Sequence, residues 1–145
     1  MVRRISSIAF INDSKATNVG ATVSAINSLR HDYQDMVLIA GGEAKSADFS
    51  LLASVFSGLC AIVLIGTDAK KIAAVVPDNT PIVYSSSLKD AINNAYQILL
   101  DQEAGKNNLG SSLILLSPAC ASFDMFDSYE DRGDQFKRYV KEITI

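Results

Sequence analysis

The chain has little of what many catalytic and metal-binding sites require. Its 145 residues include two cysteines, Cys60 and Cys120, and a single histidine, His31. Neither cysteine has a second cysteine or a histidine at metal-ligand spacing, which argues against a metal site or a disulfide framework. Ser-His or Cys-His catalysis also fits poorly, because His31 lies in a turn after a predicted helix and no other obvious base is nearby. We expect His31 on the surface and Cys60 buried as a small apolar residue.

Charge and hydropathy exclude further classes. The chain has 13 Lys and Arg against 16 Asp and Glu, a net charge of -3, so it offers no overall attraction for nucleic acid or an anionic membrane. No apolar run approaches the roughly 20 residues that span a bilayer, and the first residues lack the apolar segment of a signal peptide. We expect a cytoplasmic protein with small-molecule or protein partners. Without an internal linker or repeat, residues 1–145 are predicted to form one domain.

Strand and helix patterns alternate along the chain. Short runs rich in Val, Ile and Leu predict strands that are buried on both faces, at residues 7–11, 36–40, 61–65, 81–84 and 113–116. Helical spacing predicts helices at residues 19–29, 49–56, 69–76, 88–100 and about 129–142. Such alternation requires crossover connections and predicts an α/β fold, a Rossmann-like doubly wound sheet, mainly parallel, with helices on both faces. Ligands of such sheets bind beyond the carboxyl ends of the strands.

The loop after the first predicted strand, residues 12–18, reads Asn-Asp-Ser-Lys-Ala-Thr-Asn and opens a helix. The free N–H groups and the positive end of a helix suit a carboxylate or a phosphate. Lys15 adds a cation and Thr17 a hydroxyl, while Asp13 is an acceptor for a ribose hydroxyl, a metal-bound water or the lysine itself. An equally open interpretation makes Asp13, Ser14, Thr17 and Asn18 competing helix caps and leaves Lys15 solvated.

The loop at residues 40–48 pairs Gly41-Gly42 with Lys45-Ser46. It is not a phosphate-binding P-loop, because its glycines are adjacent and Ala44 precedes the lysine. The glycine pair permits positive φ and close backbone approach, and Lys45 is placed to reach the same anion as the first loop. The alternative is an exposed lysine before a helix that Asp48 caps. Asp68 is predicted to cap the following helix.

The loop after the last predicted strand, residues 117–126, has small residues followed by aromatic ones. Small side chains let a ligand approach the backbone, and Ser122 is able to hydrogen-bond a carboxylate. The last predicted helix contains Gly133, which costs about 1 kcal/mol of helix propensity and indicates close packing or a kink.

Three stretches together resemble one family. They are Asn-Asp-Ser-Lys-Ala-Thr-Asn at 12–18, Gly-Gly to Lys-Ser-Ala-Asp-Phe at 41–49, and Leu-Leu-Ser-Pro-Ala-Cys-Ala-Ser at 115–122 with Glu130, Arg132-Gly133 and Phe136. The chain resembles the carboxy-terminal domain of the UDP-N-acetylmuramoyl-alanine:D-glutamate ligases, in which ATP and Mg²⁺ drive amide-bond formation between UDP-N-acetylmuramoyl-L-alanine and D-glutamate. The amino-terminal uridine-nucleotide domain and the central ATPase domain of that family are expected outside this sequence, and the chain alone is expected to be inactive.

The resemblance also implies roles for individual residues. Asp13 and Lys15 resemble residues that contact ATP or ADP, and Thr17 and Lys45 resemble those that bind the α-carboxylate of D-glutamate. The side-chain carboxylate site is matched by Ser122, Phe123 and Tyr129. No residue of this domain matches a catalytic residue or a metal ligand. Two positions depart from the pattern, because the family commonly has Phe in place of Tyr129 and often Leu in place of Phe123.

Two other functions fit the same sequence. One is a stand-alone receptor for a small dicarboxylate or a nucleotide, which retains this fold and these loops. The other is a flavodoxin-like fold that binds a protein partner and has no small ligand.

Overall fold

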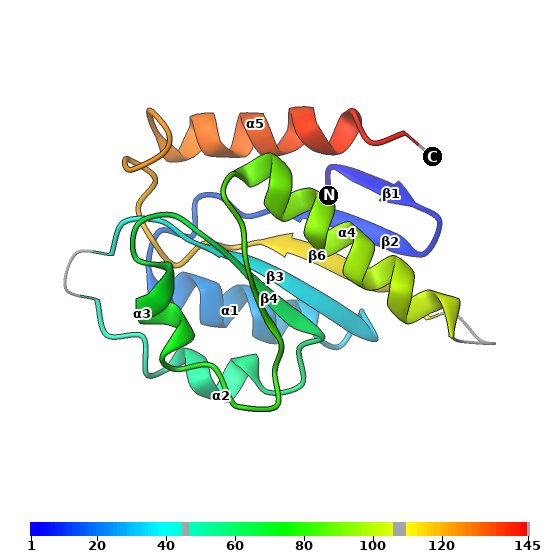
Figure 1. Ribbon diagram of the computed structural model, residues 1–145, viewed down its shortest axis with the longest axis horizontal. Helices are drawn as coiled ribbons and strands as arrows, with labels where there is room; N and C mark the ends of the chain where they lie inside the picture. Colours follow the sequence, from blue (N-terminus) through cyan, green and yellow to red (C-terminus); the bar gives the residue numbers. More distant parts are fainter. Residues whose placement is uncertain (45–46, 106–109, 145) are drawn as a thin grey trace.

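The computed structural model describes residues 1–44, 47–105 and 110–144, and within these ranges the chain forms one sheet of six strands with five helices (Figure 1). The strands are β1 (Arg3–Ile5), β2 (Ile8–Asn12), β3 (Asp35–Gly41), β4 (Ala61–Ile65), β5 (Ile82–Tyr84) and β6 (Ser112–Leu116). The helices are α1 (Val19–Leu29), α2 (Leu52–Phe56), α3 (Ala69–Ala73), α4 (Leu88–Ala104) and α5 (Tyr129–Lys141). The predicted α/β class is confirmed.

The strand order is β1-β2-β6-β3-β4-β5, and every neighbouring pair is parallel except β1 and β2. The last strand in the sequence, β6, therefore lies between β2 and β3. The antiparallel strand β1 was not predicted, because its short segment carries Arg3 and Arg4 in place of an apolar run. Its pairing with β2 makes it an edge strand, where short length and charge are normal.

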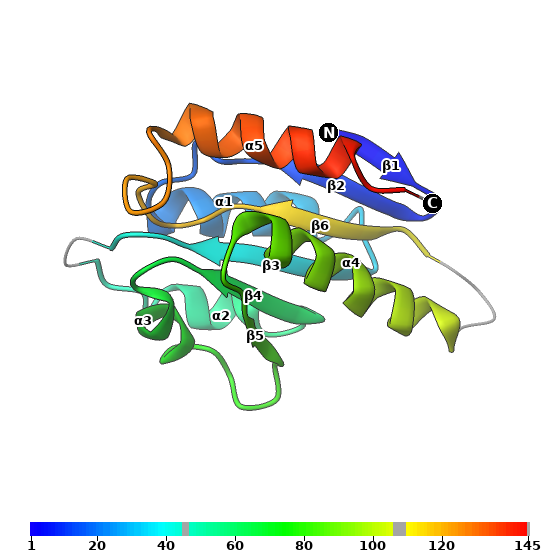
Figure 2. The same ribbon diagram turned by 45° about the horizontal axis from the view of Figure 1, so that its top comes forward.

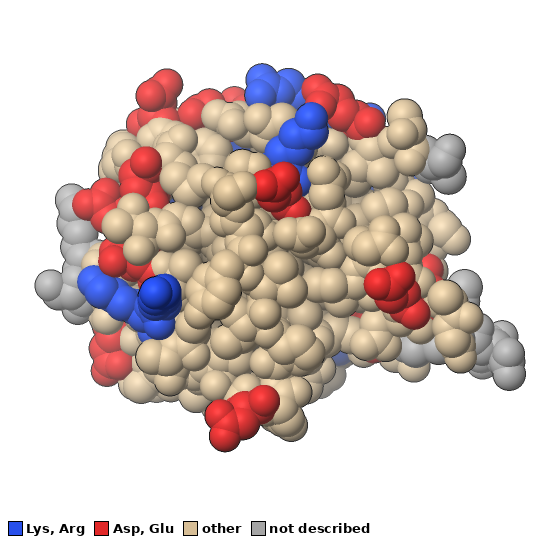
Figure 3. All heavy atoms as spheres, in the orientation of Figure 1, with Lys and Arg blue, Asp and Glu red and all other residues tan. Residues whose placement is uncertain are grey.

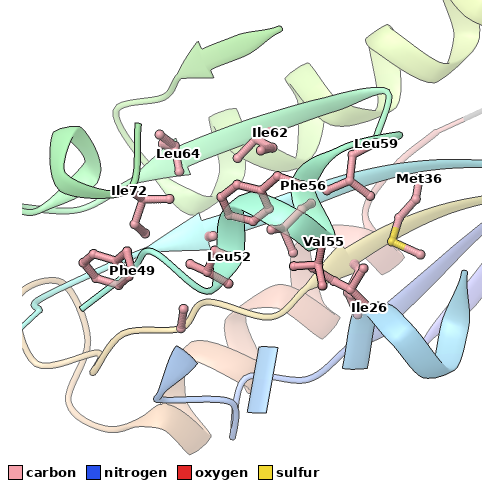
Figure 4. Packing of buried hydrophobic residues seen from close by; sticks show 14 of the residues in the cluster. Ile26, Met36, Phe49, Leu52, Val55, Phe56, Leu59, Ile62, Leu64 and Ile72 are labelled. Carbon is pink, nitrogen blue, oxygen red and sulfur yellow. The ribbon is translucent and has the colours of Figure 1, made fainter. Parts of the chain in front are cut away.

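Helices cover both faces of the sheet, as Figures 1 and 2 show. Successive strand residues point to opposite faces, so Leu38 of β3 joins one core cluster and Val37 and Ile39 join the other. The first cluster includes Ile26 of α1, and Figure 4 shows it around Phe56. The second cluster contains residues of α4 and α5. This three-layer arrangement buries the near-continuous apolar runs of the central strands on both faces.

Two helices are shorter than predicted. Helix α2 begins at Leu52 instead of residue 49 and has no side-chain cap. The Asp48 carboxylate accepts a hydrogen bond from the Ser50 backbone N–H at 2.9 Å, which lowers its pKa, so the alternative interpretation, in which Asp48 caps the helix, is wrong on that point. Phe49 is buried in the same core cluster without being helical. Helix α3 ends at Ala73 and α4 continues to Ala104.

The guanidinium of Arg3 joins the amino-terminal hairpin to the end of α5. Its Nη1 donates to the carbonyl oxygens of Val140 and Ile143, both at 2.9 Å, and to that of Lys141 at 3.3 Å. A cation at a helix carboxyl terminus satisfies its free carbonyls and interacts favourably with the helix dipole. This contact lies at the end of α5 that is far from the loops described below (Figure 2).

Charged side chains of both signs are scattered over the face seen in Figure 3, without a large patch of one sign. Among the described residues, no helix has the length and apolar character needed to cross a membrane.

Candidate functional site

Three loops meet at the carboxyl ends of adjacent strands. Loop 1 (residues 13–18) follows β2, loop 3 (residues 117–128) follows β6, and loop 2, described over 42–44 and 47–51, follows β3. Loop 1 leads to α1 on one face of the sheet, whereas loop 3 leads to α5 on the other. Neighbouring strands whose connections leave to opposite faces define a topological switch point, where open α/β sheets bind their ligands. We therefore take this edge as the candidate site.

In loop 1, buried and exposed residues alternate. Ser14 and Ala16 are 4% and 1% exposed, whereas Lys15 and Thr17 are exposed to solvent. The helix cap is Asn18, whose side-chain oxygen accepts from the Ala21 backbone N–H at 2.9 Å. The interpretation of loop 1 as competing caps therefore holds for Asn18 alone.

The Asp13 carboxylate lies between loops 1 and 3. Its Oδ2 accepts a hydrogen bond from the Ser117 hydroxyl at 3.0 Å, and the Asp13 N–H donates to the Leu116 carbonyl at 2.8 Å. Ser117 in turn is linked to α1, because the Thr22 hydroxyl donates to the Ser117 carbonyl at 3.1 Å. Asp13 is thus held in place, half-buried, at the mouth of the sheet.

Loops 2 and 3 pair with each other through their backbones. Glu43 and Ala121 exchange two hydrogen bonds, of 3.1 and 3.2 Å. Gly42 has a φ of +143°, and a Cβ added there would lie 2.3 Å from the Ala121 carbonyl oxygen. At Gly41, with a φ of +121°, a Cβ would lie 1.9 Å from the Ile65 carbonyl oxygen. Both features that the sequence predicted for the glycine pair, a positive φ and a close approach of the backbone, are therefore present.

Two carboxylates hold these loops without capping a helix. Asp68 stands at the amino terminus of α3, but its side chain makes no capping hydrogen bond there. Its Oδ2 accepts from the Ala44 N–H at 2.7 Å, and this bond, with Lys71, lowers the Asp68 pKa. Asp124 of loop 3 accepts from the Thr67 N–H at 2.9 Å. The predicted cap role of Asp68 is wrong, because its carboxylate accepts from a loop amide and makes no capping hydrogen bond to the helix.

A buried arginine lies beneath loops 1 and 3. Arg132, in the second turn of α5, is 1% exposed. Its Nε donates to the Ser14 hydroxyl at 2.9 Å, its Nη2 to the Ser14 carbonyl at 2.7 Å, and its Nη1 to the Cys120 carbonyl at 3.0 Å. The Ser14 hydroxyl donates onward to the Tyr129 carbonyl at 2.7 Å. Burial lowers the Arg132 pKa to about 10, so the guanidinium stays protonated at neutral pH.

Neither Cys120 nor His31 has the character of a catalytic group. Cys120 is 1% exposed, and burial raises the pKa of its thiol to about 12. A thiol that stays protonated at neutral pH is a poor nucleophile. His31 is exposed in a turn, as predicted. Cys60 is half-buried, whereas we predicted a buried apolar residue, and its thiol donates to the Asp35 carboxylate at 3.5 Å.

The predicted site residues at this edge line three different cavities, and no single cavity contains them all. Thr17 lines a cavity of about 230 Å³ whose other lining residues are mostly small and come from the start of α1 and from loops 2 and 3, with one acidic residue among them: Asn18, Val19, Glu43, Ala44, Ala47, Ala119, Cys120 and Ala121. Asp13 and Lys15 line a groove of about 590 Å³ against α1. Lys15 also lines a third cavity, of about 290 Å³, with Tyr129.

The four other predicted site residues are Ser122, Phe123, Tyr129 and Lys45. Ser122 is buried, with 2% of its surface exposed, and it lines none of these three cavities. Phe123 is 67% exposed and Tyr129 43%, so both present aromatic surface at the edge. Lys45 lies outside the described residues. Asp13, Lys15 and Thr17 thus lie together on loop 1, whereas Ser122 is buried beneath the surface.

Sequence reasoning gave no role to Arg132, Asp68 or Asp124 in this arrangement. The bonds of Arg132 join it to a residue 118 positions earlier, which spacing along the chain does not reveal. One signal did exist in the adjacent Gly133. A Cβ at Gly133 would lie 2.9 Å from Asn12 Nδ2 and 3.3 Å from Ser14 Cβ, so the close packing expected there is present, and it points to the same contact between α5 and loop 1.

The sheet, its switch point and its loops define a Rossmann-like α/β domain with an open ligand edge. Residues 1–120 match the family described as Mur ligase, glutamate ligase domain. The chain belongs to the Mur ligase family, and it corresponds to the carboxy-terminal domain of the D-glutamate ligases in it.

Two curated relatives illustrate the similarity. The UDP-N-acetylmuramoylalanine–D-glutamate ligase of Marinobacter nauticus is 48% identical over 143 residues, covering 98% of this chain and 30% of that protein. The enzyme of the same name from Pseudomonas fluorescens Pf-5 is 44% identical over 145 residues, covering 99% of this chain and 30% of that protein. The chain therefore spans about 30% of the length of these relatives.

Solved structures share the fold at low identity. Folylpolyglutamate synthase from Mycobacterium tuberculosis, complexed with ADP, superposes with a TM-score of 0.60 at 15% identity, over 88% of this chain and 29% of that one. The UDP-N-acetylmuramate–alanine ligase MurC from Thermotoga maritima gives a TM-score of 0.51 at 11% identity, over 94% of this chain and 27% of that one. At such identities the comparison supports the fold and no residue role.

Proposed function

We propose that this chain is the D-glutamate-binding domain of a cytoplasmic UDP-N-acetylmuramoylalanine–D-glutamate ligase that acts in peptidoglycan synthesis. The observation that carries the proposal is the meeting of loops 1, 2 and 3 around one cavity at the amino terminus of α1. The 48% identity to a ligase of that name supports the choice of substrate. In the proposed reaction, the amine of D-glutamate forms an amide with the alanine carboxyl of UDP-N-acetylmuramoyl-L-alanine.

D-Glutamate carries two carboxylates, and the cavity at Thr17 suits one of them. The free N–H groups and the positive end of α1 favour an anion there, and the Thr17 hydroxyl is an additional donor. Small residues of loops 2 and 3, among them Ala44 and Ala121, line the cavity and let a ligand approach the backbone. We assign the α-carboxylate to this cavity, with Lys45 as a further proposed contact from sequence.

The second carboxylate is assigned to the edge of loop 3. Ser122, Phe123 and Tyr129 remain its proposed contacts. Because Ser122 is buried, contact between its hydroxyl and a ligand requires residues of loop 3 to move. The exposed Phe123 and Tyr129 side chains flank that part of the site.

The groove at Asp13 and Lys15 fits part of a nucleotide. Its wall on α1 is formed by small and apolar side chains, and its mouth carries the Asp13 carboxylate and the Lys15 ammonium. Asp13 would accept from a ribose hydroxyl, and Lys15 would neutralise phosphate charge. When bound, ATP supplies the phosphoryl group that activates the carboxylate for attack.

Mg²⁺ has no cluster of ligands in the described part of the chain, where no group of three His, Cys, Asp or Glu side chains is placed to hold an ion. Protein-bound Mg²⁺ commonly uses one or two carboxylates, waters and the phosphates of its substrate. We therefore propose that the ion and most of the ATP are held by a central domain outside this sequence. The residues of this chain contribute binding and orientation, which account for much of the catalysis in such reactions. The chain alone is expected to lack activity.

A substitution at Thr17 tests the proposal in the complete ligase. Among the described residues the Thr17 hydroxyl makes no hydrogen bond, so Thr17→Val removes a proposed ligand contact without removing an internal one. A lost hydrogen bond to a charged group costs about 1.5 to 3 kcal/mol, so the KM for D-glutamate should rise by about tenfold or more. The matched control is Thr67→Val, because Thr67 is also exposed on a loop at the edge of the sheet but lines none of the three cavities. An unchanged KM in Thr17→Val, with the parent enzyme active, would refute the assignment of this cavity.

A stand-alone receptor for a small dicarboxylate or a nucleotide is the alternative, because the cavity at Thr17 and the groove at Asp13 and Lys15 would also suit such a ligand. Calorimetry of the isolated chain with D-glutamate and with ATP separates the two functions. The ligase proposal expects weak or undetectable binding, because each ligand lacks the contacts of the other domains. Tight binding by the isolated chain would favour the receptor.

A further inference from the structure

Burial of the Arg132 guanidinium carries a large free-energy cost for a residue with a purely structural role. Desolvating a charge costs several kcal/mol unless it is paired, and replacement of buried ionic groups by apolar ones of similar size is often neutral or stabilising. Among the described residues Arg132 forms no ion pair, and its acceptors are two carbonyl oxygens and one hydroxyl. The cost of burying an unpaired charge therefore points to a role for this arginine in addition to fold stability.

The acceptors of Arg132 identify what it holds. Two of them belong to Ser14 and the third to Cys120, so one rigid guanidinium bridges loops 1 and 3. An arginine presents its donors in a fixed planar fork, which sets the separation and the orientation of the groups it binds. Loops 1 and 3 are further joined where the Ala119 N–H donates to the Ala16 carbonyl at 3.0 Å.

The anchored residues alternate with those that face the ligand edge. Ser14 is buried against Arg132, while its neighbours Asp13 and Lys15 line the groove at α1. Cys120 has its carbonyl on Arg132, and it lines the cavity that contains Thr17. A shift of Ser14 would therefore move groups that line the groove, and a shift of Cys120 would move groups that line the cavity.

We propose that Arg132 is a positioning residue of the ligand edge, which fixes loops 1 and 3 relative to each other so that their binding groups meet one D-glutamate molecule. The inference rests on the proposed function. Arg132 touches no substrate in this account and acts through Ser14 and Cys120. The next residue of the helix, Gly133, supports the same contact, because its missing side chain lets α5 lie directly against Asn12 and Ser14.

The test compares Arg132→Met with Arg3→Met in the complete ligase. Arg3 is a matched control, since its guanidinium also has three acceptors, in this case all backbone carbonyls, at the opposite end of the same helix. Both variants should lose thermal stability. Only Arg132→Met should raise the KM for D-glutamate, by about tenfold or more, whereas the KM for UDP-N-acetylmuramoyl-L-alanine should change by less than about twofold. A loss of folded enzyme would instead lower kcat for all substrates and leave each KM unchanged.

Arg132→Lys provides the conservative variant, because a lysine keeps the charge and is able to reach part of the acceptors. It should recover part of the D-glutamate KM, and it decides the matter if Arg132→Met does not fold. The proposal is overturned if folded Arg132→Met or Arg132→Lys binds D-glutamate as the parent does, or if Arg3→Met raises the same KM equally. A parent enzyme that does not use D-glutamate would overturn the proposed function itself, so the two failures are distinguishable.

Discussion

Replacement of Gly133 by alanine should change the free energy of unfolding through two opposing effects of the added Cβ. Alanine is favoured over glycine inside a helix by about 1 kcal/mol. The added Cβ, however, would lie 2.9 Å from Asn12 Nδ2 and 3.3 Å from Ser14 Cβ. Asn12 is not free to move away, because its Oδ1 accepts from the Ser14 N–H at 3.0 Å. Overpacking of this kind costs about 1 to 3 kcal/mol, and loss of the hydrogen bond about 1 kcal/mol more. We expect Gly133→Ala to destabilise the chain by about 1 to 2 kcal/mol.

The measurement is urea or thermal unfolding of the isolated chain, in which 1 kcal/mol corresponds to about 3 °C in Tm for a protein of this size. Gly20→Ala is the matched control, since this helical glycine is exposed and its Cβ would meet only Asn18 Oδ1, at an ordinary 3.5 Å. The control should stabilise the chain by up to about 1 kcal/mol.

Removal of the Asn12 side chain should reverse the sign of the stability change that Gly133→Ala causes. In an Asn12→Ala background, the Cβ of Gly133→Ala loses its nearest neighbour, and the substitution should become neutral or stabilising. The reasoning is refuted if Gly133→Ala stabilises the chain in the parent background as Gly20→Ala does, or if its effect is the same with and without Asn12.

Two further predictions concern the glycine loop and the buried thiol. Gly41→Ala should destabilise by about 3 kcal/mol or more in urea unfolding, because its Cβ would fall 1.9 Å from the Ile65 carbonyl oxygen at a φ of +121°; a loss below about 1 kcal/mol would contradict the described path of β3 and β4. Thiol labelling of the folded chain should modify Cys60 at most, and raising the pH from 8 to 10 should not make Cys120 reactive, since its thiol stays protonated below a pKa of about 12. In urea Cys120 should label as an ordinary thiol, and fast labelling of Cys120 in the folded chain would show that it is not buried.

The sheet was predictable because strands that are buried on both faces have a simple sequence pattern, an unbroken apolar run. The central strands need apolar residues at every position, so β3, β4 and β6 appear as unbroken runs. The short strand β1 lies at the edge, where packing demands little, and its arginines hid it. Helices α2 and α3 were overestimated, because apolar residues such as Phe49 can be buried from a loop as well as from a helix.

The position of the candidate site was also predictable, but its internal contacts were not. Loops after parallel strands must meet at one edge, and sequence alone identified the three loops. Which loop residues bind one another depends on the strand order, with β6 between β2 and β3, and on the register of those strands. The contact of Arg132 with Ser14 joins α5 to the loop after β2, and that of Asp68 with Ala44 joins the loops after the neighbouring strands β4 and β3. Whether Thr17, Ser122 and the other proposed contacts bind D-glutamate stays a prediction.

The amino-terminal strand β1 also protects the sheet from association with another chain. Without it, β2 would present a row of unpaired N–H and C=O groups, flanked by apolar side chains such as Ile8 and Phe10, to any exposed strand in solution. With it, the outermost strand has three residues, and two of them are arginines. An incoming strand would have to desolvate the exposed Arg4 and would find few residues with which to pair. The charges that made β1 hard to detect in the sequence are thus the features that oppose pairing of a further strand at this edge.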